Sequence, residues 1–526
     1  MVTILLGIWG NYLCMPVWNF RSPGMWCFLL VLGVIAFILS ASLDWFSTED
    51  FKNTAVFLIS AVIFVLLLLI GGLTSWELFT ANQYHSLMHL EESSDFSSDI
   101  PSVSDTTPIS IVDVKTARKL GDRTIGGIPN ASWYEVDNEY NLIKYQGKYY
   151  RISPLNYGGL FKYNKAKNDG IPGYVLVDIQ TQEAKYVELE EPIKYSPSAH
   201  FSHLLKRHLR NCYPGYFFGS SFFEINEEGK PYYITTVETP TIGLFGGKKV
   251  TSFILTDAVT GQNQEYSQDT LPEWVDHAYS ISYLMRLTKY HQLYVDGWWN
   301  SWTSQTGVYK TTYQYKSSDF DGYNTTIDSN GDVVFYTGVT PASGAESNVG
   351  FILANPRTGV VTYYPCAGAE ESSAQVAAES LVKNMQYTAS FPTILNVDGV
   401  ETYFMLLKDT AGLVQRYALC NVRDYTKVVQ AESLESALSL YRQKLAGEVT
   451  SLPDIQELIG NISSLYQAEI EGYTYYYFTL EGSNNLCMSS IVNSNRQVLL
   501  TVGTKVEIEF TASSEDGVFV VHKIQF

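Results

Sequence analysis

The hydrophobic and polar positions of this chain repeat one arrangement four times after residue 150. A strand-like run is followed by a short polar turn, a second strand-like run and then a helix-like stretch. Each turn begins with Asp or Asn, whose side chain can accept hydrogen bonds from the backbone two residues further on and fix a hairpin. A repeat of this kind predicts consecutive small α+β units. The turns begin at Asp178, Asp257, Asn355 and Asn421.

Each of the four units is expected to carry one helix. The second predicted helix follows Thr270, with Glu273 three residues later, a spacing typical of a capping box at a helix start. Asp276 and His277 lie in the same first turn, although the neighbouring Trp274 indicates that this segment packs against the protein. The four predicted helices cover residues 197–210, 271–287, 373–384 and 434–445.

The first 76 residues have a different pattern, with two long apolar runs at 25–43 and 54–73. Each run has about the length needed to cross a bilayer. Residues 1–20 are also uncharged but are interrupted by glycines and Pro16, so they form either a third span or an interfacial segment. A cleaved signal peptide fits poorly because no basic region precedes the first run. We therefore expect a transmembrane anchor of two or three helices over 1–76.

The segments between the anchor and the end of the chain differ in character. Residues 77–112 are rich in Ser, Thr, Asp and Glu and predict an acidic tether. Residues 113–169 predict a small α+β segment, and 170–450 contain the repeats. Five alternating strands in 460–526 are similar to an OB-type barrel. Its aromatic strand 473–480 is accompanied by glutamates and not by basic residues, which favours a packed barrel or a protein-docking face over nucleic-acid binding.

The repeated unit resembles known bacterial envelope modules. The turns Asp257-Ala-Val-Thr-Gly261 and Asn355-Pro-Arg-Thr-Gly359, between two strands and beside a helix, are similar to those of PepSY-type modules. Further stretches, such as Lys119-Leu-Gly-Asp-Arg123, resemble uncharacterised membrane-anchored proteins of Gram-positive bacteria. The resemblance implies an α+β fold with N-terminal transmembrane helices, tandem PepSY-like hairpin and helix modules, and a C-terminal OB-like barrel. It implies no activity.

The charge of the chain excludes one class of partner. Lys and Arg number 35 against 54 Asp and Glu, a formal net charge of −19. Such a surface repels nucleic acid, and no basic stripe interrupts it. No Lys or Arg occurs between the second apolar run and Lys115, which favours an extracytoplasmic position for the body. The six cysteines are scattered singly and indicate neither a disulfide framework nor a zinc site.

Several motifs suggest chemistry but fit it poorly. His200, His203 and His208 fall on one predicted helix, yet no carboxylate completes a metal-ligand set. The stretch 243–249 lacks the spacing of a phosphate-binding loop and predicts a glycine hairpin. The Asp-rich turns at 319–322 and 328–332 lack the Gly and Glu of a calcium loop. We therefore predict no catalytic, cofactor-binding or metal-binding residue.

The strongest candidate for binding is aromatic. Trp298, Trp299 and Trp302 fall within five residues, and their side chains cannot all point into one core. Exposed indoles are common at protein contacts and also stack on sugar faces. We expect a non-catalytic envelope scaffold or sensor in the cell membrane, in contact with lipid bilayer and with other envelope proteins or further copies of itself. The alternatives are a binding module for cell-wall glycan or peptide, and an enzyme of unrecognised type.

Overall fold

The structure is a computed structural model of the chain, and it divides into two compact units, residues 1–438 and 439–526. The residues described are 2–43, 50–93, 95–104, 107–315, 322–342, 347–445, 456–470, 473–483, 485–490, 495–512 and 518–526. The Asp-rich stretch expected as a turn at 319–322 lies outside them except for Gly322.

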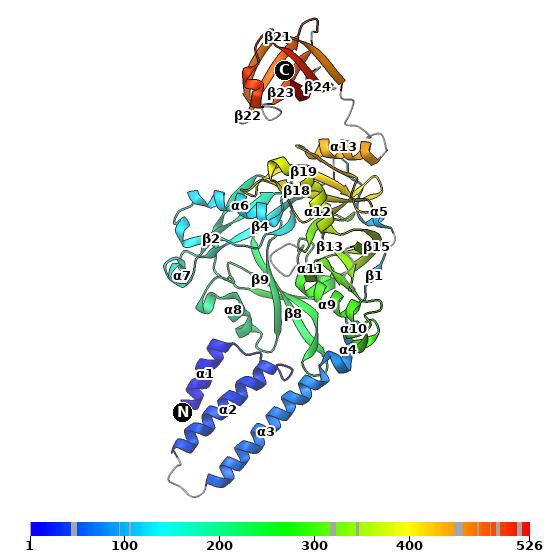
Figure 1. Cartoon of the computed structure of the whole chain (residues 1–526). Coiled ribbons are helices and arrows are strands. Elements are labelled where there is room, and N and C mark those ends of the chain that lie inside the picture. The colour runs from blue at the N-terminus through cyan, green and yellow to red at the C-terminus, as the bar shows by residue number, and fades with distance from the viewer. Residues whose placement is uncertain are drawn as a thin grey trace. The chain divides into compact units, whose positions relative to one another are not determined.

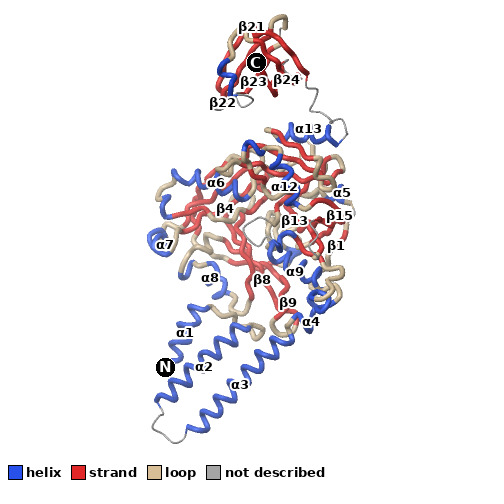
Figure 2. Tube along the Cα trace, in the orientation of Figure 1, coloured by secondary structure: helices blue, strands red, loops and turns tan. Residues whose placement is uncertain are grey.

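Four mostly antiparallel sheets make up most of the first unit, as the red strands of Figure 2 and the labels of Figure 1 show. The first has the order β2-β4-β5-β6, with β3 also on β4, and its strands are β2 (Tyr134–Val136), β3 (Asn141–Tyr145), β4 (Lys148–Tyr157), β5 (Ile171–Asp178) and β6 (Ala184–Ile193). The second has the order β10-β9-β8-β7, and its strands are β7 (Phe217–Ile225), β8 (Pro231–Ile242), β9 (Gly246–Asp257) and β10 (Asn263–Tyr266).

The other two sheets are built mostly from residues beyond 300. The third has the order β1-β15-β14-β13-β11, with β12 also on β13, and its strands are β1 (Glu91–Glu92), β11 (Tyr309–Thr311), β12 (Asn324–Ile327), β13 (Val333–Pro341), β14 (Ser347–Ala354) and β15 (Val361–Ala369). The fourth has the order β16-β18-β19-β20, with β17 also on β18, and its strands are β16 (Thr388–Ala389), β17 (Thr393–Val397), β18 (Val400–Lys408), β19 (Val414–Asn421) and β20 (Val428–Ala431).

The four repeated turns form as the sequence predicts. In each, the side-chain oxygen of the first residue accepts the backbone N–H groups two and three positions further on, at N···O distances of 2.8–3.0 Å. The turns join β5 to β6, β9 to β10, β14 to β15 and β19 to β20, one hairpin in each sheet. The repeat therefore places one side-chain-capped hairpin in every sheet. The turn residues are Asp178, Asp257, Asn355 and Asn421.

The expected fold class is wrong. The hairpins are not separate PepSY-like modules with one helix each, because they are the outer parts of four- to six-stranded sheets. Pairings between strands that are not consecutive in the chain, such as β1 with β15 and β2 with β4, enlarge these sheets, and they leave no local signal in the sequence. The helices between the sheets are short, and they are α6 (Val114–Thr124), α7 (Leu160–Ala166), α8 (Leu205–Cys212), α9 (Ile281–Leu293), α10 (Gly297–Trp302), α11 (Thr312–Tyr315), α12 (Glu371–Ser380) and α13 (Leu434–Leu445).

Two of the four predicted helices begin later than expected. The segment 197–210 contains a 3₁₀ turn, Phe201–His203, before α8 begins at Leu205. The capping pattern at Thr270 belongs to another 3₁₀ turn, in which Ser267 is the cap. Helix α9 starts instead after Ser280, whose side chain accepts the N–H of Tyr283 at 3.0 Å. A capping signal thus marked a single turn and not the helix.

The N-terminal residues form three apolar helices, α1 (Val2–Cys14), α2 (Pro23–Leu43) and α3 (Asp50–Thr74). The two expected transmembrane helices are not found as such. Among the described residues no single helix has both the length and the apolar character required to cross a bilayer. The stretch 59–74 and the following helix α4 (Glu77–His85) are long and apolar enough only when taken together. The two helices meet at a bend of 47°. This corrects the transmembrane part of the predicted fold.

The residues just before α2 and just after α3 form hydrogen bonds with the second sheet. Arg21 donates to the carbonyl of Pro240 at 2.5 Å. The Ser75 hydroxyl accepts the N–H of Phe245 at 2.8 Å. Phe245 lies in the tight turn between β8 and β9, so the glycine-rich stretch 243–249 is the hairpin that its sequence predicts.

The segment expected to be an acidic tether is folded over much of its described length. It contains α4, the strand β1, which pairs in parallel with β15, and the short helix α5 (Phe96–Asp99). Phe96 and Ile100 are buried in the core cluster shared by the third and fourth sheets. Its polar composition predicted an exposed segment, and these two apolar side chains are sufficient to fix part of it against the body.

The second unit contains the five strands expected in the tail, and they close into a barrel in the order β21-β22-β23-β25-β24. Ile462, Phe478 and Ile508 are fully buried in its centre. On β22, Phe478 points into this core, while Tyr466 of the neighbouring strand is exposed. The strands are β21 (Gln456–Ile470), β22 (Tyr473–Leu480), β23 (Leu486–Ser490), β24 (Lys505–Ala512) and β25 (Val518–Gln525).

Candidate functional site

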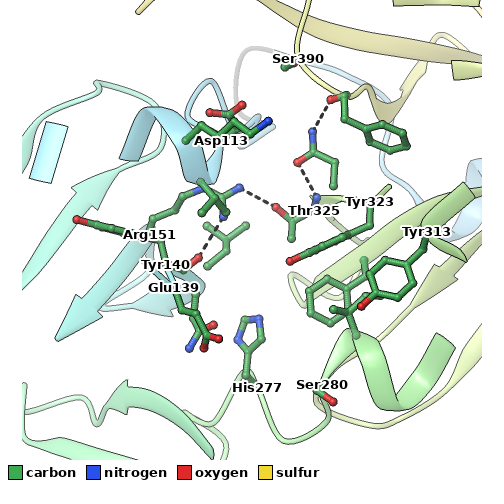
Figure 3. A pocket seen from close by; sticks show the side chains of 18 of the residues that line it. Asp113, Glu139, Tyr140, Arg151, His277, Ser280, Tyr313, Tyr323, Thr325 and Ser390 are labelled. Atoms are coloured by element: carbon green, nitrogen blue, oxygen red, sulfur yellow. Dashed lines mark hydrogen bonds between the residues drawn. The ribbon is translucent and has the colours of Figure 1, made fainter. Parts of the chain in front are cut away.

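A cavity of about 550 Å³ lies where the four sheets of the first unit come together. Every sheet contributes at least one strand residue to its wall, and the loop before α9 and the start of α6 complete it. Its volume falls within the range of about 300–1,000 Å³ that is usual for small-molecule sites. Figure 3 shows the side chains of Arg151, His277 and Tyr323 reaching it from different elements. We call it the Arg151 cleft.

Arg151 on β4 is the central charged group of the Arg151 cleft. Its side chain is only 2% exposed, and its guanidinium donates three hydrogen bonds, all to uncharged oxygens. Within the described part of the chain it forms no ion pair. Burial lowers the pKa of Arg151, although Asp113 partly opposes this effect. The acceptors are the carbonyl of Val112 at 2.6 Å, the carbonyl of Tyr140 at 3.4 Å and the hydroxyl of Thr325 at 3.0 Å.

These hydrogen bonds also hold the sheets together around the cleft. Through Thr325, Arg151 connects β4 of the first sheet to β12 of the third (Figure 3). The neighbouring Asn324 donates to the carbonyl of Phe391, between β16 and β17 of the fourth sheet, at 2.9 Å. Asn141 on β3 donates to the carbonyl of Phe223 on β7 at 3.3 Å. Links between all four sheets keep the cleft open in one shape, as binding requires.

Asp113 and Lys408 form a buried ion pair at another part of the wall. The ammonium of Lys408 donates to the Asp113 carboxylate, and both side chains are largely buried. The carboxylate also caps α6 by accepting the N–H of Thr116 at 2.8 Å. Burial alone would raise the pKa of Asp113, but Lys408 and Thr116 outweigh it and hold this pKa below its ordinary value. The negative charge of Asp113 is thus satisfied within the protein.

His277 enters the cleft from the loop before α9, with two buried carboxyl groups beside it. Burial lowers the pKa of His277 to about 4, so the imidazole is neutral at pH 7. Its Nδ1 lies 3.4 Å from Oε1 of Glu224 and has no hydrogen-bond partner among the described residues. Glu224 accepts the N–H groups of Asp276 at 2.9 Å and His277 at 2.5 Å. Burial raises the pKa of Glu224 to about 8 and that of Asp276 to about 7.

An aromatic wall faces the charged part of the cleft. The rings of Tyr313 and Tyr323 meet edge to face at 5.7 Å, and Tyr323 meets Phe335 in the same way at 5.6 Å. Phe222 and Phe391 extend the apolar surface. Uncharged polar side chains supply hydrogen-bonding groups between the rings. They are Asn141, Ser220, Ser221, Ser280, Ser282, Asn324, Gln375, Thr388 and Ser390.

The predicted binding residues lie elsewhere, on the short helix α10. Trp298 is half-buried and packs against the core cluster beneath the third sheet. Trp299 and Trp302 are 64% and 71% exposed. The ring of Trp298 meets Trp299 at 5.0 Å, edge to face, and lies stacked 6.4 Å from Trp302. The three indoles therefore form one cluster with a single anchored member, and none of them lines the Arg151 cleft.

The other sequence candidates have structural contacts. His208 Nε2 lies 2.7 Å from the carbonyl of Gly261, and His203 Nδ1 lies 3.3 Å from the hydroxyl of Tyr163. Asp328 fixes its own hairpin by accepting the N–H groups of Asn330 and Asp332. In the described ranges no group of three His, Cys, Asp or Glu side chains could hold a metal ion.

Sequence reasoning missed most of the cleft. It identified Asp276 and His277 as a pair on a helix start, and these residues lie instead in a buried loop beside Glu224. Arg151 was visible only as a charged residue in the interior of the strand 148–157, whose other charged residue, Lys148, is at its exposed first position. A lone cation in a buried strand is itself a signal, because charged side chains are rarely buried without a partner.

Comparison with known proteins gives little help. No family model matches the chain, and no curated protein does. Among solved structures, an exo-1,5-α-L-arabinanase from a bovine ruminal metagenomic library is 9% identical, with 74% of this chain and 97% of that chain covered and a TM-score of 0.17. A putative glycoside hydrolase from Parabacteroides distasonis ATCC 8503 is 11% identical, with 66% and 85% covered and a TM-score of 0.18. Scores this low establish neither a fold nor a function.

Proposed function

We propose that this protein is a non-catalytic binding module that holds a glycan or a short peptide in the Arg151 cleft. The observation that carries the proposal is the composition of the cleft, in which an aromatic wall faces hydroxyl and amide side chains around one buried cation. Aromatic faces stack on the apolar faces of sugars and on peptide side chains, while polar groups fix the orientation of the ligand.

The state of the carboxylates favours binding over hydrolysis. Most glycosidases use two carboxyl groups on opposite sides of the scissile bond. Of the two carboxylates that line the cleft, Asp113 is bound to Lys408 and caps α6. The negative charge of Asp113 is thus already balanced within the protein. Glu139 is the other, and burial together with Asp137 raises its pKa. One available carboxyl group supports recognition better than a two-carboxylate mechanism.

The test is a binding measurement on the full chain. An array of oligosaccharides and short peptides, followed by calorimetry of the positive members, should identify ligands. Replacing an aromatic wall residue, Tyr323→Ala, should weaken their binding about fivefold, because stacking is worth about 0.5–1.5 kcal/mol. Tyr466→Ala is the matched control, since Tyr466 is exposed on the barrel.

Three results would contradict the proposal. The absence of any ligand in the array would do so, and so would equal binding by the Tyr323→Ala variant. The third is release of shortened sugars or peptides from a bound ligand at a rate that Glu139→Gln abolishes, which would make the protein an enzyme.

A second function is suggested by the tryptophan cluster. We propose that Trp299 and Trp302 form a contact with another copy of the chain, in line with a scaffold. Exposed indoles are frequent hot spots of protein interfaces, and their loss typically costs about 2 kcal/mol or more of binding free energy. Sedimentation of the full chain over a range of concentrations tests the contact. A chain that remains monomeric at all concentrations would contradict it.

A further inference from the structure

The Arg151 cleft carries a positive charge within an acidic protein. Three cations line it, Lys115, Arg151 and Lys408, against two carboxylates, Asp113 and Glu139, while His277 is neutral at pH 7. The whole chain carries a formal charge of −19. A single excess positive charge enclosed by sheets thus contrasts with the surrounding surface, and a cleft of this kind concentrates anions.

Arg151 is the source of this charge, because the charge of Lys408 is balanced by Asp113. A buried cation without an opposite charge costs free energy, and folded proteins seldom retain one. The three oxygens that Arg151 contacts are all neutral. They fix the guanidinium without neutralising its charge, and the nearby carboxylate of Asp113 is already paired with Lys408. A guanidinium held in this way is prepared to receive a carboxylate by two parallel hydrogen bonds.

We infer that the ligand of the Arg151 cleft carries a carboxylate, which binds the guanidinium of Arg151, and that this ligand is an acidic sugar. The inference rests on the proposed function and specifies its ligand class. The sugar is favoured over a peptide because the rings of Tyr313, Tyr323 and Phe335 line the same cleft as Arg151. A hexuronic acid has a flat apolar face for these rings and one carboxylate for Arg151.

The decisive comparison uses the unmodified full chain, so it does not depend on any variant folding. Digalacturonate and its dimethyl ester have the same rings and differ in charge. N-acetyl-trialanine and its C-terminal amide make the same comparison for a peptide carboxylate. Calorimetry should show digalacturonate binding at least about tenfold more tightly than its ester, since a charge-assisted hydrogen bond is worth about that factor or more. The peptide acid should bind more weakly than digalacturonate.

The variant Arg151→Lys tests whether Arg151 causes the preference for the acid over the ester. It keeps the charge and removes the paired donors, so the preference for the acid over the ester should fall severalfold. Thermal unfolding checks that the variant is folded. Lys115→Gln is the control for a general charge effect, because Lys115 lines the same cleft from the exposed first turn of α6.

The outcomes separate this inference from the proposed function. Equal affinity for acid and ester overturns the carboxylate inference and leaves cleft binding intact. A stronger preference for the peptide acid overturns the assignment to sugars. Failure of all four probes to bind overturns the inference, while the array and Tyr323→Ala decide the proposed function on their own. An acid preference that is unchanged in a folded Arg151→Lys variant removes Arg151 from the site.

Discussion

The Arg151 cleft and the tryptophan cluster of α10 are two candidate binding regions built on opposite principles. In the cleft, Arg151 and the Asp113–Lys408 pair are largely buried, and hydrogen bonds link the four sheets around them. In the cluster, two of three indoles are exposed on a six-residue helix and only Trp298 reaches the core. The cleft is therefore part of what holds the fold together. The tryptophan cluster, in contrast, contributes little to holding the fold together.

This difference has a consequence for mutations. A substitution in the cleft changes stability and binding together, because the same side chains serve both. Substitutions at Trp299 and Trp302 change association alone, because these exposed side chains contribute few contacts to the folded chain.

The largest loss is expected for Lys408→Met. This change leaves the carboxylate of Asp113 buried without its counter-ion, and removal of one partner of a buried pair costs about 3–5 kcal/mol. Urea unfolding at pH 7 measures the loss. The double variant Asp113→Asn/Lys408→Met should recover much of it, because Asn removes the charge and still caps α6. A double variant no more stable than Lys408→Met would show that the pair is not the origin of the loss.

The same pair predicts a loss of stability in acid. The pKa of Asp113 is lower in the folded chain than its ordinary value of 3.8, so its contribution is present above about pH 4 and is lost as the pH falls through the folded-state pKa. Lys408→Met should weaken this acid dependence. Stability curves of both proteins between pH 5 and pH 2 make the comparison.

The buried carboxyl groups beside His277 predict the opposite trend at neutral pH. The pKa of Glu224 is raised from 4.5 to about 8, so its contribution is full below pH 4.5 and is lost as the pH rises through 8. His277, with its pKa lowered from 6.5 to about 4, loses its contribution only below pH 6.5. Between pH 6.5 and 8 the carboxyl groups dominate, and stability should fall by about 2 kcal/mol.

Glu224→Gln tests this assignment by removing the ionisation. The fall in stability between pH 6.5 and 8 should become clearly smaller, whatever the absolute stability of the variant. The exposed Glu227→Gln serves as the control and should leave the slope unchanged. A slope that is the same in Glu224→Gln and in the original chain would mean that another group titrates in this range.

The contrast between the two regions also explains what could be predicted from the sequence. The capped turn at Asp257 and the strands of the tail depend on neighbouring residues, and both form where they were expected. The three tryptophans were visible because they are adjacent in the chain. Arg151, Thr325 and Lys408 are separated by more than 80 residues from one another. Only the pairing of sheets brings them together, and no local pattern records that pairing.

The errors have the same origin. The expected transmembrane helices rested on apolar composition within single windows, and the expected modules rested on the hairpin nearest to each turn. Whether a hairpin stands alone or extends a larger sheet depends on strands such as β1 and β11, which pair with β15 and β13 and are not their neighbours in the chain. The sequence therefore predicted the units of the fold better than their assembly.

A moderate effect is expected for Trp298→Ala. Trp298 is half-buried against the core cluster that includes Tyr84 and Leu287. Removing its ring should cost about 2 kcal/mol, less than the 3–5 kcal/mol of a fully buried aromatic residue. Unfolding in urea measures the change. A cost below 0.5 kcal/mol would mean that the helix α10 is not anchored by this ring.

The smallest effect on stability is expected for the double variant Trp299→Ala/Trp302→Ala. Both side chains are mostly exposed, so the free energy of unfolding should change by no more than about 0.5 kcal/mol. Any self-association of the full chain should nevertheless weaken strongly, because it is here that indoles would meet a second copy. Sedimentation at matched concentrations measures the association, and binding of the cleft ligand should remain unchanged. If the double variant unfolds as readily as Trp298→Ala, the three rings form one structural unit and the distinction between an anchored and an exposed part is wrong. If it also loses the cleft ligand, the two regions are coupled, and the cluster cannot be regarded as an independent attachment to the fold.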